Sequence, residues 1–77
     1  MLDQRLKELR EAASLTQAQA AEQASGLIEG VTITEDQLRH YEAGRARPPA
    51  EKMLALSRLY RVGYSDLSLT GLPGGGR

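Results

Sequence analysis

Residues 34–44, Thr-Glu-Asp-Gln-Leu-Arg-His-Tyr-Glu-Ala-Gly, carry the strongest helix signals in the chain. Thr34 supplies a hydroxyl that can cap a helix, and Gln37 stands at the capping-box position three residues later. Two acidic residues in the first turn suit the positive end of the helix dipole. Gly44 is expected to end the helix, because glycine readily adopts the left-handed conformation that follows a last turn. The side chains expected to face a core are Leu38 and Tyr41.

Four further helices are predicted on either side of this segment. The first is indicated over residues 2–12 by apolar side chains at three- and four-residue spacing. Those side chains are Leu2, Leu6, Leu9 and Ala13. Thr16 is expected to cap a second helix that ends near Ser25, and Pro49 to set the first turn of a helix over 49–60. The core face of that helix is expected to contain Met53, Leu54, Leu56, Leu59 and Tyr60. Ser65 is expected to cap a brief last helix that carries Leu67. The fold class is therefore all-α, a compact five-helix bundle around one core.

Residues 25–33 interrupt the helical pattern. Gly26 and Gly30 favour turns, while the β-branched side chains that follow favour extended backbone. An elongated loop is expected here, or a small hairpin around Glu29-Gly30.

Length and composition bound the organisation of the chain. Its 77 residues fit one domain, which we expect over residues 1–69, followed by a flexible glycine-rich tail over 70–77. With no cysteine and one histidine, the chain offers no set of metal ligands, and no cofactor is indicated. No apolar run is long enough for a signal peptide or a membrane span, so a cytoplasmic protein without membrane contact is expected.

The charges of the chain are polarised although its formal net charge is zero. Residues 1–38 hold three cationic and seven acidic side chains, a balance of −4, whereas residues 39–61 hold six and two, a balance of +4. Such a chain can present one basic face, and phosphate contacts respond to the local potential. Ordinary solvated helix faces would give the same pattern.

Several groups of residues, taken in order, resemble the phage repressor and Cro helix-turn-helix family, also called the xenobiotic response element family. The first groups are Arg5-Leu6-Lys7-Glu8-Leu9-Arg10, Leu15-Thr16-Gln17 and Leu38-x-x-Tyr41-Glu42-x-Gly44-x-x-x-Pro48. The stretch from Leu54 to Asp66-Leu67 is similar to the fourth and fifth helices of that family. The resemblance spans residues 2–69 and implies a domain that binds double-stranded DNA with its third helix in the major groove.

The resemblance also implies roles for individual residues. Arg10 and Glu42 match a semi-buried ion pair that ties the first helix to the end of the third. Gln17 matches a glutamine that donates to a phosphate at a helix N-terminus. The expected phosphate contacts are Thr16, Gln17, Arg39, Arg45 and Arg47. The base-facing residues expected in the third helix are Thr34, Glu35, Asp36, Gln37 and His40; Gln37 can pair with adenine, and a carboxylate can accept from cytosine.

The chain departs from the family pattern in two places. The turn between the second and third helices is enlarged near residues 25–31, so the two helices keep their usual arrangement only if these residues loop outward. In addition, Glu35 and Asp36 bring negative charge to the end of the helix that would approach the duplex. Stabilisation of a helix N-terminus explains both carboxylates without DNA.

The sequence thus predicts a sequence-specific transcriptional regulator, a repressor that binds a two-fold symmetric operator as a homodimer. Expected self-association surfaces are the last helix with Leu67, Leu69 and Leu72, or the 25–33 loop with Leu27 and Ile28. The alternative is a protein-binding module, an antitoxin or accessory subunit, that keeps the fold with little DNA affinity and uses the 25–33 loop. An enzyme is not expected, because His40 and Glu42 lie two residues apart and therefore on different helix faces.

Overall fold

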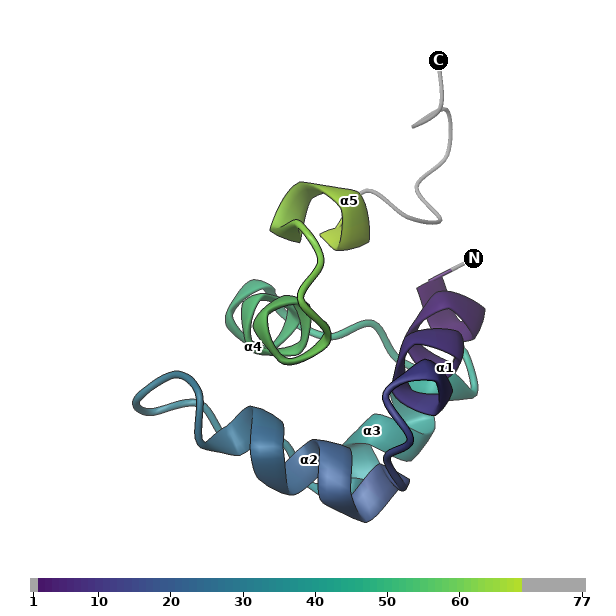
Figure 1. Cartoon of the computed structure of the whole chain (residues 1–77), viewed down its shortest axis with the longest axis horizontal. Helices are drawn as coiled ribbons and strands as arrows, with labels where there is room; N and C mark the ends of the chain where they lie inside the picture. Colours follow the sequence, from purple (N-terminus) through teal and green to yellow (C-terminus); the bar gives the residue numbers. More distant parts are fainter. Residues whose placement is uncertain (1, 69–77) are drawn as a thin grey trace.

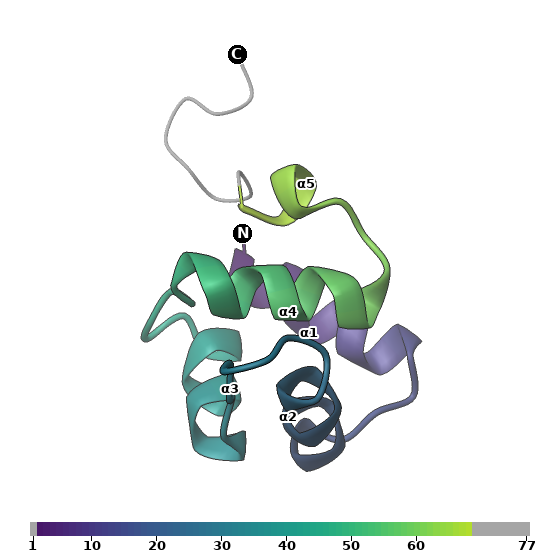
Figure 2. The same cartoon turned by 90° about the vertical axis from the view of Figure 1, so that its left-hand side faces the viewer.

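The computed structural model describes residues 2–68, and within this range the chain forms five helices and no strand. They are α1 (Leu2–Ala12), α2 (Gln17–Ser25), α3 (Glu35–Glu42), α4 (Ala50–Tyr60) and α5 (Tyr64–Ser68). Helix α4 lies between α5 on one side and the α2–α3 pair on the other (Figures 1 and 2). The predicted all-α, five-helix architecture is confirmed. The predicted tail over residues 70–77 and the side chains of Leu69 and Leu72 lie outside the described residues.

One core collects side chains from every helix and from the loop after α2. The most completely buried of its leucines are Leu6, Leu38, Leu56 and Leu67. Burial of each such side chain stabilises the fold by about 1.5–3 kcal/mol. The remaining core residues are Leu2, Ala20, Ala21, Ala24, Val31, Ile33, Tyr41, Met53, Ala55 and Tyr60. Because Leu67 is only 1% exposed, it belongs to this core, and the prediction that it offers a self-association surface is wrong.

Both predicted threonine caps are present, and each belongs to a complete capping box. The Thr34 hydroxyl accepts from the backbone N–H of Gln37 at 3.0 Å, and the Gln37 side chain accepts from the backbone N–H of Thr34 at 3.2 Å. Thr16 and Gln19 make the same exchange at the start of α2, at 3.1 and 2.9 Å. These bonds satisfy N–H groups that a helix leaves open and fix where α2 and α3 begin.

Other expectations about the helix ends and core faces are wrong in detail. Ala13 is exposed, since α1 ends at Ala12. Pro49 precedes α4 as its N-cap instead of opening the first turn. Ser65 lies inside α5, which begins one residue earlier. Leu54 and Leu59 are only half-buried; the smaller Ala55 and Ser57 are buried instead, where α4 packs against its neighbours.

The enlarged turn between α2 and α3 is a closed loop without a hairpin. The Ser25 hydroxyl oxygen accepts from the backbone N–H of Ile33 at 2.8 Å and lies 2.8 Å from the carbonyl oxygen of Ala21. Val31 and Ile33 are buried in the core, so the chain returns to the base of the loop before α3 begins. The loop projects beyond the end of α2, and α2 and α3 remain side by side (Figures 1 and 2).

Candidate nucleic-acid interface

A buried polar cluster joins α1, the start of α2 and the end of α3. Arg10 donates from Nε to Glu42 Oε2 at 2.8 Å and from Nη2 to Glu42 Oε1 at 3.0 Å. Arg10 Nη1 also donates to the carbonyl oxygen of Leu15 at 2.8 Å, just before α2. The side chains of Arg10 and Glu42 are only 12% and 4% exposed. Bidentate geometry of this kind is the strong form of an arginine–carboxylate pair. Together with the bond to Leu15, it fixes α1, the start of α2 and the end of α3 relative to one another.

The hydrogen bond to Glu42 raises the pKa of Arg10, against the opposing effect of burial. Tyr60 lies close enough to Arg10 and Glu42 to interact with their charges. Burial raises the pKa of Tyr60, and the negative charge of Glu42 adds to the shift. The Tyr60 hydroxyl is buried without a hydrogen-bond partner among the described residues. The phenol therefore stays neutral over the ordinary pH range.

The structure places Gln17 within this cluster. Gln17 Nε2 donates to Glu42 Oε1 at 3.1 Å, so the side chain is oriented across the start of α2 toward the end of α3. An open pocket beside it is lined by both Gln17 and Arg39, two of the expected phosphate contacts; the other lining residues are Lys7, Arg10, Glu42 and Ala43. Lys7 is a further cation at this place, and its position in the sequence had not indicated a phosphate contact. The pocket combines cationic side chains with a helix N-terminus, which is chemistry suited to an anion.

The outer face of α3 carries most of the expected base-facing residues. Thr34, Glu35 and Asp36 are exposed, and Gln37 and His40 are half-buried. Asp36 forms an ion pair with Arg39, and its other carboxylate oxygen lies 3.4 Å from His40 Nε2. The charge of Asp36 is therefore balanced within α3 itself, whereas Glu35 has no such partner among the described residues. Only one of the two acidic side chains thus brings an unbalanced charge to the start of the helix.

Gln37 is held from two sides. Its Oε1 accepts from the backbone N–H of Thr34 and, at 3.0 Å, from Nζ of Lys52 on α4. No local pattern indicates the second contact, because Lys52 lies on another helix and reaches Gln37 only once α3 and α4 are packed.

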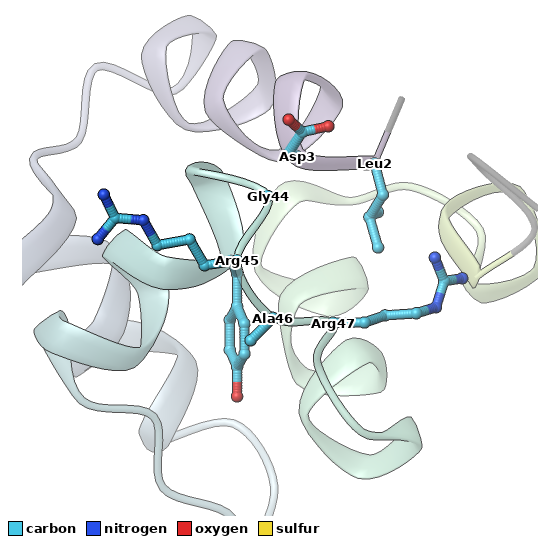
Figure 3. Close-up of a pocket in the computed structure, with 7 residues that line it drawn as sticks. Leu2, Asp3, Gly44, Arg45, Ala46 and Arg47 are labelled. Carbon is cyan, nitrogen blue, oxygen red and sulfur yellow. The ribbon is translucent and has the colours of Figure 1, made fainter.

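Arg45 and Arg47 diverge from the connection between α3 and α4 (Figure 3). Arg47 extends toward α5 and donates to the carbonyl oxygen of Ser68 in its last turn. Arg45 is exposed and points to the opposite side (Figure 3). Both line a pocket whose other residues are Leu2, Asp3, Tyr41, Gly44 and Ala46. The two arginines, expected to act alike, therefore occupy different environments.

Residues 2–68 contain no cluster of acidic and histidine side chains that could hold a metal ion. Within the same range, every helix is too short or too polar to cross a membrane.

Comparison with known protein families gives a match over most of the chain. Residues 2–69 match a protein family described as a helix-turn-helix domain, and the match extends over all five helices. No curated protein and no solved structure matches the chain significantly.

Proposed function

Because the chain belongs to the helix-turn-helix domain family, we propose that it is a sequence-specific transcriptional repressor that acts in the cytoplasm. The family implies DNA binding and a role in transcription. The proposal adds that α3 enters the major groove, where residues of its N-cap and first two turns face base edges. The proposed base-facing residues are Thr34, Glu35, Asp36, Gln37 and His40.

The observation that carries this proposal is the cluster around Glu42. It holds the N-terminus of α2 against the end of α3, so that a phosphate bound at α2 and a base edge met by α3 have a fixed relation. Phosphate contacts position a protein on the duplex, and base contacts then read the sequence. The proposed phosphate contacts near the cluster are Thr16, Gln17 and Arg39, with Arg45 on the connection after α3. Each of three expected contacts already has a partner within the protein: Gln17 donates to Glu42, Arg39 pairs with Asp36, and Arg47 donates to the carbonyl oxygen of Ser68. Of these partners, only that of Arg47 lies on α5, away from the α2–α3 pair (Figure 1).

We also propose that the protein acts as a homodimer on a two-fold symmetric operator. One domain of this size makes few base contacts, and dimers that bind half-sites about one helical turn apart multiply them. The side chains available for association include Leu27 and Tyr64, which are the exposed large apolar residues among those described, at 44% and 38%.

Selection from a random duplex library tests the proposal. Folded protein is mixed with the library at moderate salt, and bound duplexes are sequenced after several rounds. We expect an enriched palindrome with half-sites about one helical turn apart. Sedimentation of the protein with the selected duplex should give two chains per site. Failure of folded protein to enrich any sequence contradicts the proposal.

The alternative function is that of a protein-binding module, and the 25–33 loop favours it. Leu27 is exposed on a projecting loop, and that loop carries Glu29 and no cation that could meet a phosphate. Changing Leu27 to Ser separates the two roles. DNA selection by the variant should match the wild type if α3 reads DNA, whereas capture of a partner protein should be lost if the loop is the functional surface.

A further inference from the structure

The side-chain amide of Gln37 has one fixed orientation. Oε1 accepts from the backbone N–H of Thr34 at 3.2 Å and from Lys52 Nζ at 3.0 Å. Both partners can only donate, so the oxygen and not the amide nitrogen must face them. A carbonyl oxygen has two lone pairs, and the two contacts use both.

The amide nitrogen of Gln37 is consequently the group left for a ligand. Gln37 is half-buried, and no described residue accepts a hydrogen bond from its Nε2. Among residues 2–68, the Tyr60 hydroxyl is the only buried side-chain nitrogen or oxygen atom that lacks a hydrogen-bond partner. Gln37 Nε2 also lacks such a partner among these residues, so it is not buried. Nε2 therefore reaches the surface of α3, where it presents N–H donors and no acceptor.

A glutamine that only donates distinguishes bases differently from an unconstrained one. The bidentate pairing of glutamine with adenine requires its oxygen to accept from adenine N6 while its nitrogen donates to N7. In this protein that oxygen is occupied. Guanine offers two acceptors in the major groove, N7 and O6, and no donor there that needs the oxygen.

We infer that Gln37 reads guanine through Nε2, and that Lys52 sets this preference as a positioning residue by occupying Oε1. This inference rests on the proposed function, since it names the base that one residue of the DNA-reading helix selects. It replaces the expectation that Gln37 pairs with adenine. Lys52 acts from α4 and determines specificity without itself contacting the base.

Duplex selection with four proteins tests the inference: the wild type, Gln37→Ala, Gln37→Glu and Lys52→Met. The base position that loses its preference in Gln37→Ala is the one read by Gln37. We expect the wild type to favour guanine over adenine there by about fivefold or more, the discrimination of one good base contact. Removal of the ammonium in Lys52→Met frees a lone pair, and adenine should then be bound as well as guanine, or better.

Gln37→Glu replaces the donor group that faces the base with an acceptor and changes the shape of the side chain little. One carboxylate oxygen can still accept from Thr34 and Lys52, as in the standard capping box, while the other replaces the donor with an acceptor. We expect the preference to move from guanine to a base with an exposed amino group, cytosine or adenine. This variant keeps the inference testable if Gln37→Ala fails to fold, which circular dichroism would reveal.

Lys7→Met is the matched charge control, because Lys7 is the other lysine of the chain and lines the pocket beside Gln17, to which Gln37 does not contribute. It should weaken binding to every duplex without changing any base preference. Any of three results overturns the inference and leaves the proposed function standing. The three are that the wild type prefers adenine at this position, that Gln37→Ala selects guanine as strongly as the wild type, and that Lys52→Met keeps the wild-type base preferences. Absence of any enriched duplex overturns both.

Discussion

Arg10 and Glu42 lie 32 residues apart in the chain, and the guanidinium of the first donates twice to the carboxylate of the second, at 2.8 and 3.0 Å. This contact closes α1 onto the end of α3 and, through Leu15 and Gln17, fixes the start of α2. Its position makes it both a stabilising element and the frame of the proposed DNA-reading surface.

We expect Glu42→Gln to lower the free energy of unfolding by about 3 kcal/mol. The substitution keeps the shape of the side chain but leaves the buried Arg10 without its counter-charge, which is the costly way to break such a pair. Denaturant unfolding followed by circular dichroism measures the change. Glu22→Gln, at an exposed position of α2, is the matched control and should leave the midpoint where it is. Equal midpoints for the two variants would contradict a structural role of the pair.

Tyr60→Phe should leave the protein as stable as the wild type, or more stable by up to about 1 kcal/mol. The substitution removes a buried hydroxyl that has no hydrogen-bond partner among residues 2–68, so no bond is lost with it. Thermal unfolding at neutral pH gives the comparison. A loss of 1 kcal/mol or more would show that the hydroxyl has a stabilising partner.

Tyr60→Phe should also change how the stability of the protein depends on pH. Burial raises the pKa of Tyr60 in the folded protein, so above the ordinary tyrosine pKa of about 10 the phenol ionises in the unfolded chain first. Ionisation then favours unfolding, and wild-type stability should fall as the pH rises beyond 10. Tyr60→Phe should lose less over this range. Tyr64→Phe, at an exposed side chain, is the control and should follow the wild-type curve.

Gly44→Ala should destabilise the fold by about 1 kcal/mol. Gly44 has a φ of +77°, a left-handed conformation that alanine adopts at a cost, and an added Cβ would lie 3.0 Å from Asp3 Oδ2. Since the Asp3 carboxylate can rotate away, the backbone conformation accounts for most of the loss. Gly26→Ala is the matched comparison, with a φ of −91° and its nearest neighbouring atom 3.7 Å away. Denaturant unfolding should separate the two variants, with Gly26→Ala close to the wild type.

Arg45→Ala and Arg47→Ala should have different effects on a selected duplex. Loss of an exposed phosphate contact at Arg45 should weaken binding to all sequences and reduce the slope of log affinity against log salt by about 1. Arg47→Ala should leave that slope unchanged and instead lower the thermal midpoint, because Arg47 donates to the last turn of α5. Fluorescence anisotropy at several salt concentrations decides between them. Equal slopes for Arg45→Ala and the wild type would remove Arg45 from the interface.

The helices could be predicted from the sequence because their signals are local. Thr16 and Thr34 cap helices through contacts within three residues, and the leucine spacing marks one buried face wherever the helix packs. The break in the helical pattern at residues 25–33 could also be predicted, because Gly26, Gly30 and the β-branched residues are local signals too. The sequence did not decide between an elongated loop and a small hairpin, because that choice depends on the contact of Ser25 with Ile33 and on the burial of Val31 and Ile33.

The candidate site likewise has features that the sequence indicates and features that depend on how the helices pack. Sequence alone determined the five helices and, through its resemblance to a family, predicted the Arg10–Glu42 pair that the structure contains. The base-facing role of α3 that the same resemblance implies remains part of the proposed function. Only the tertiary structure decided that Arg47 contacts α5, that Leu67 is buried, and that Lys52 occupies the oxygen of Gln37. The physical reason is that hydrogen bonds between side chains on different helices require those helices to be packed first. A local pattern fixes where a helix begins and ends, but it carries no information about which donor will reach an acceptor on a neighbouring helix.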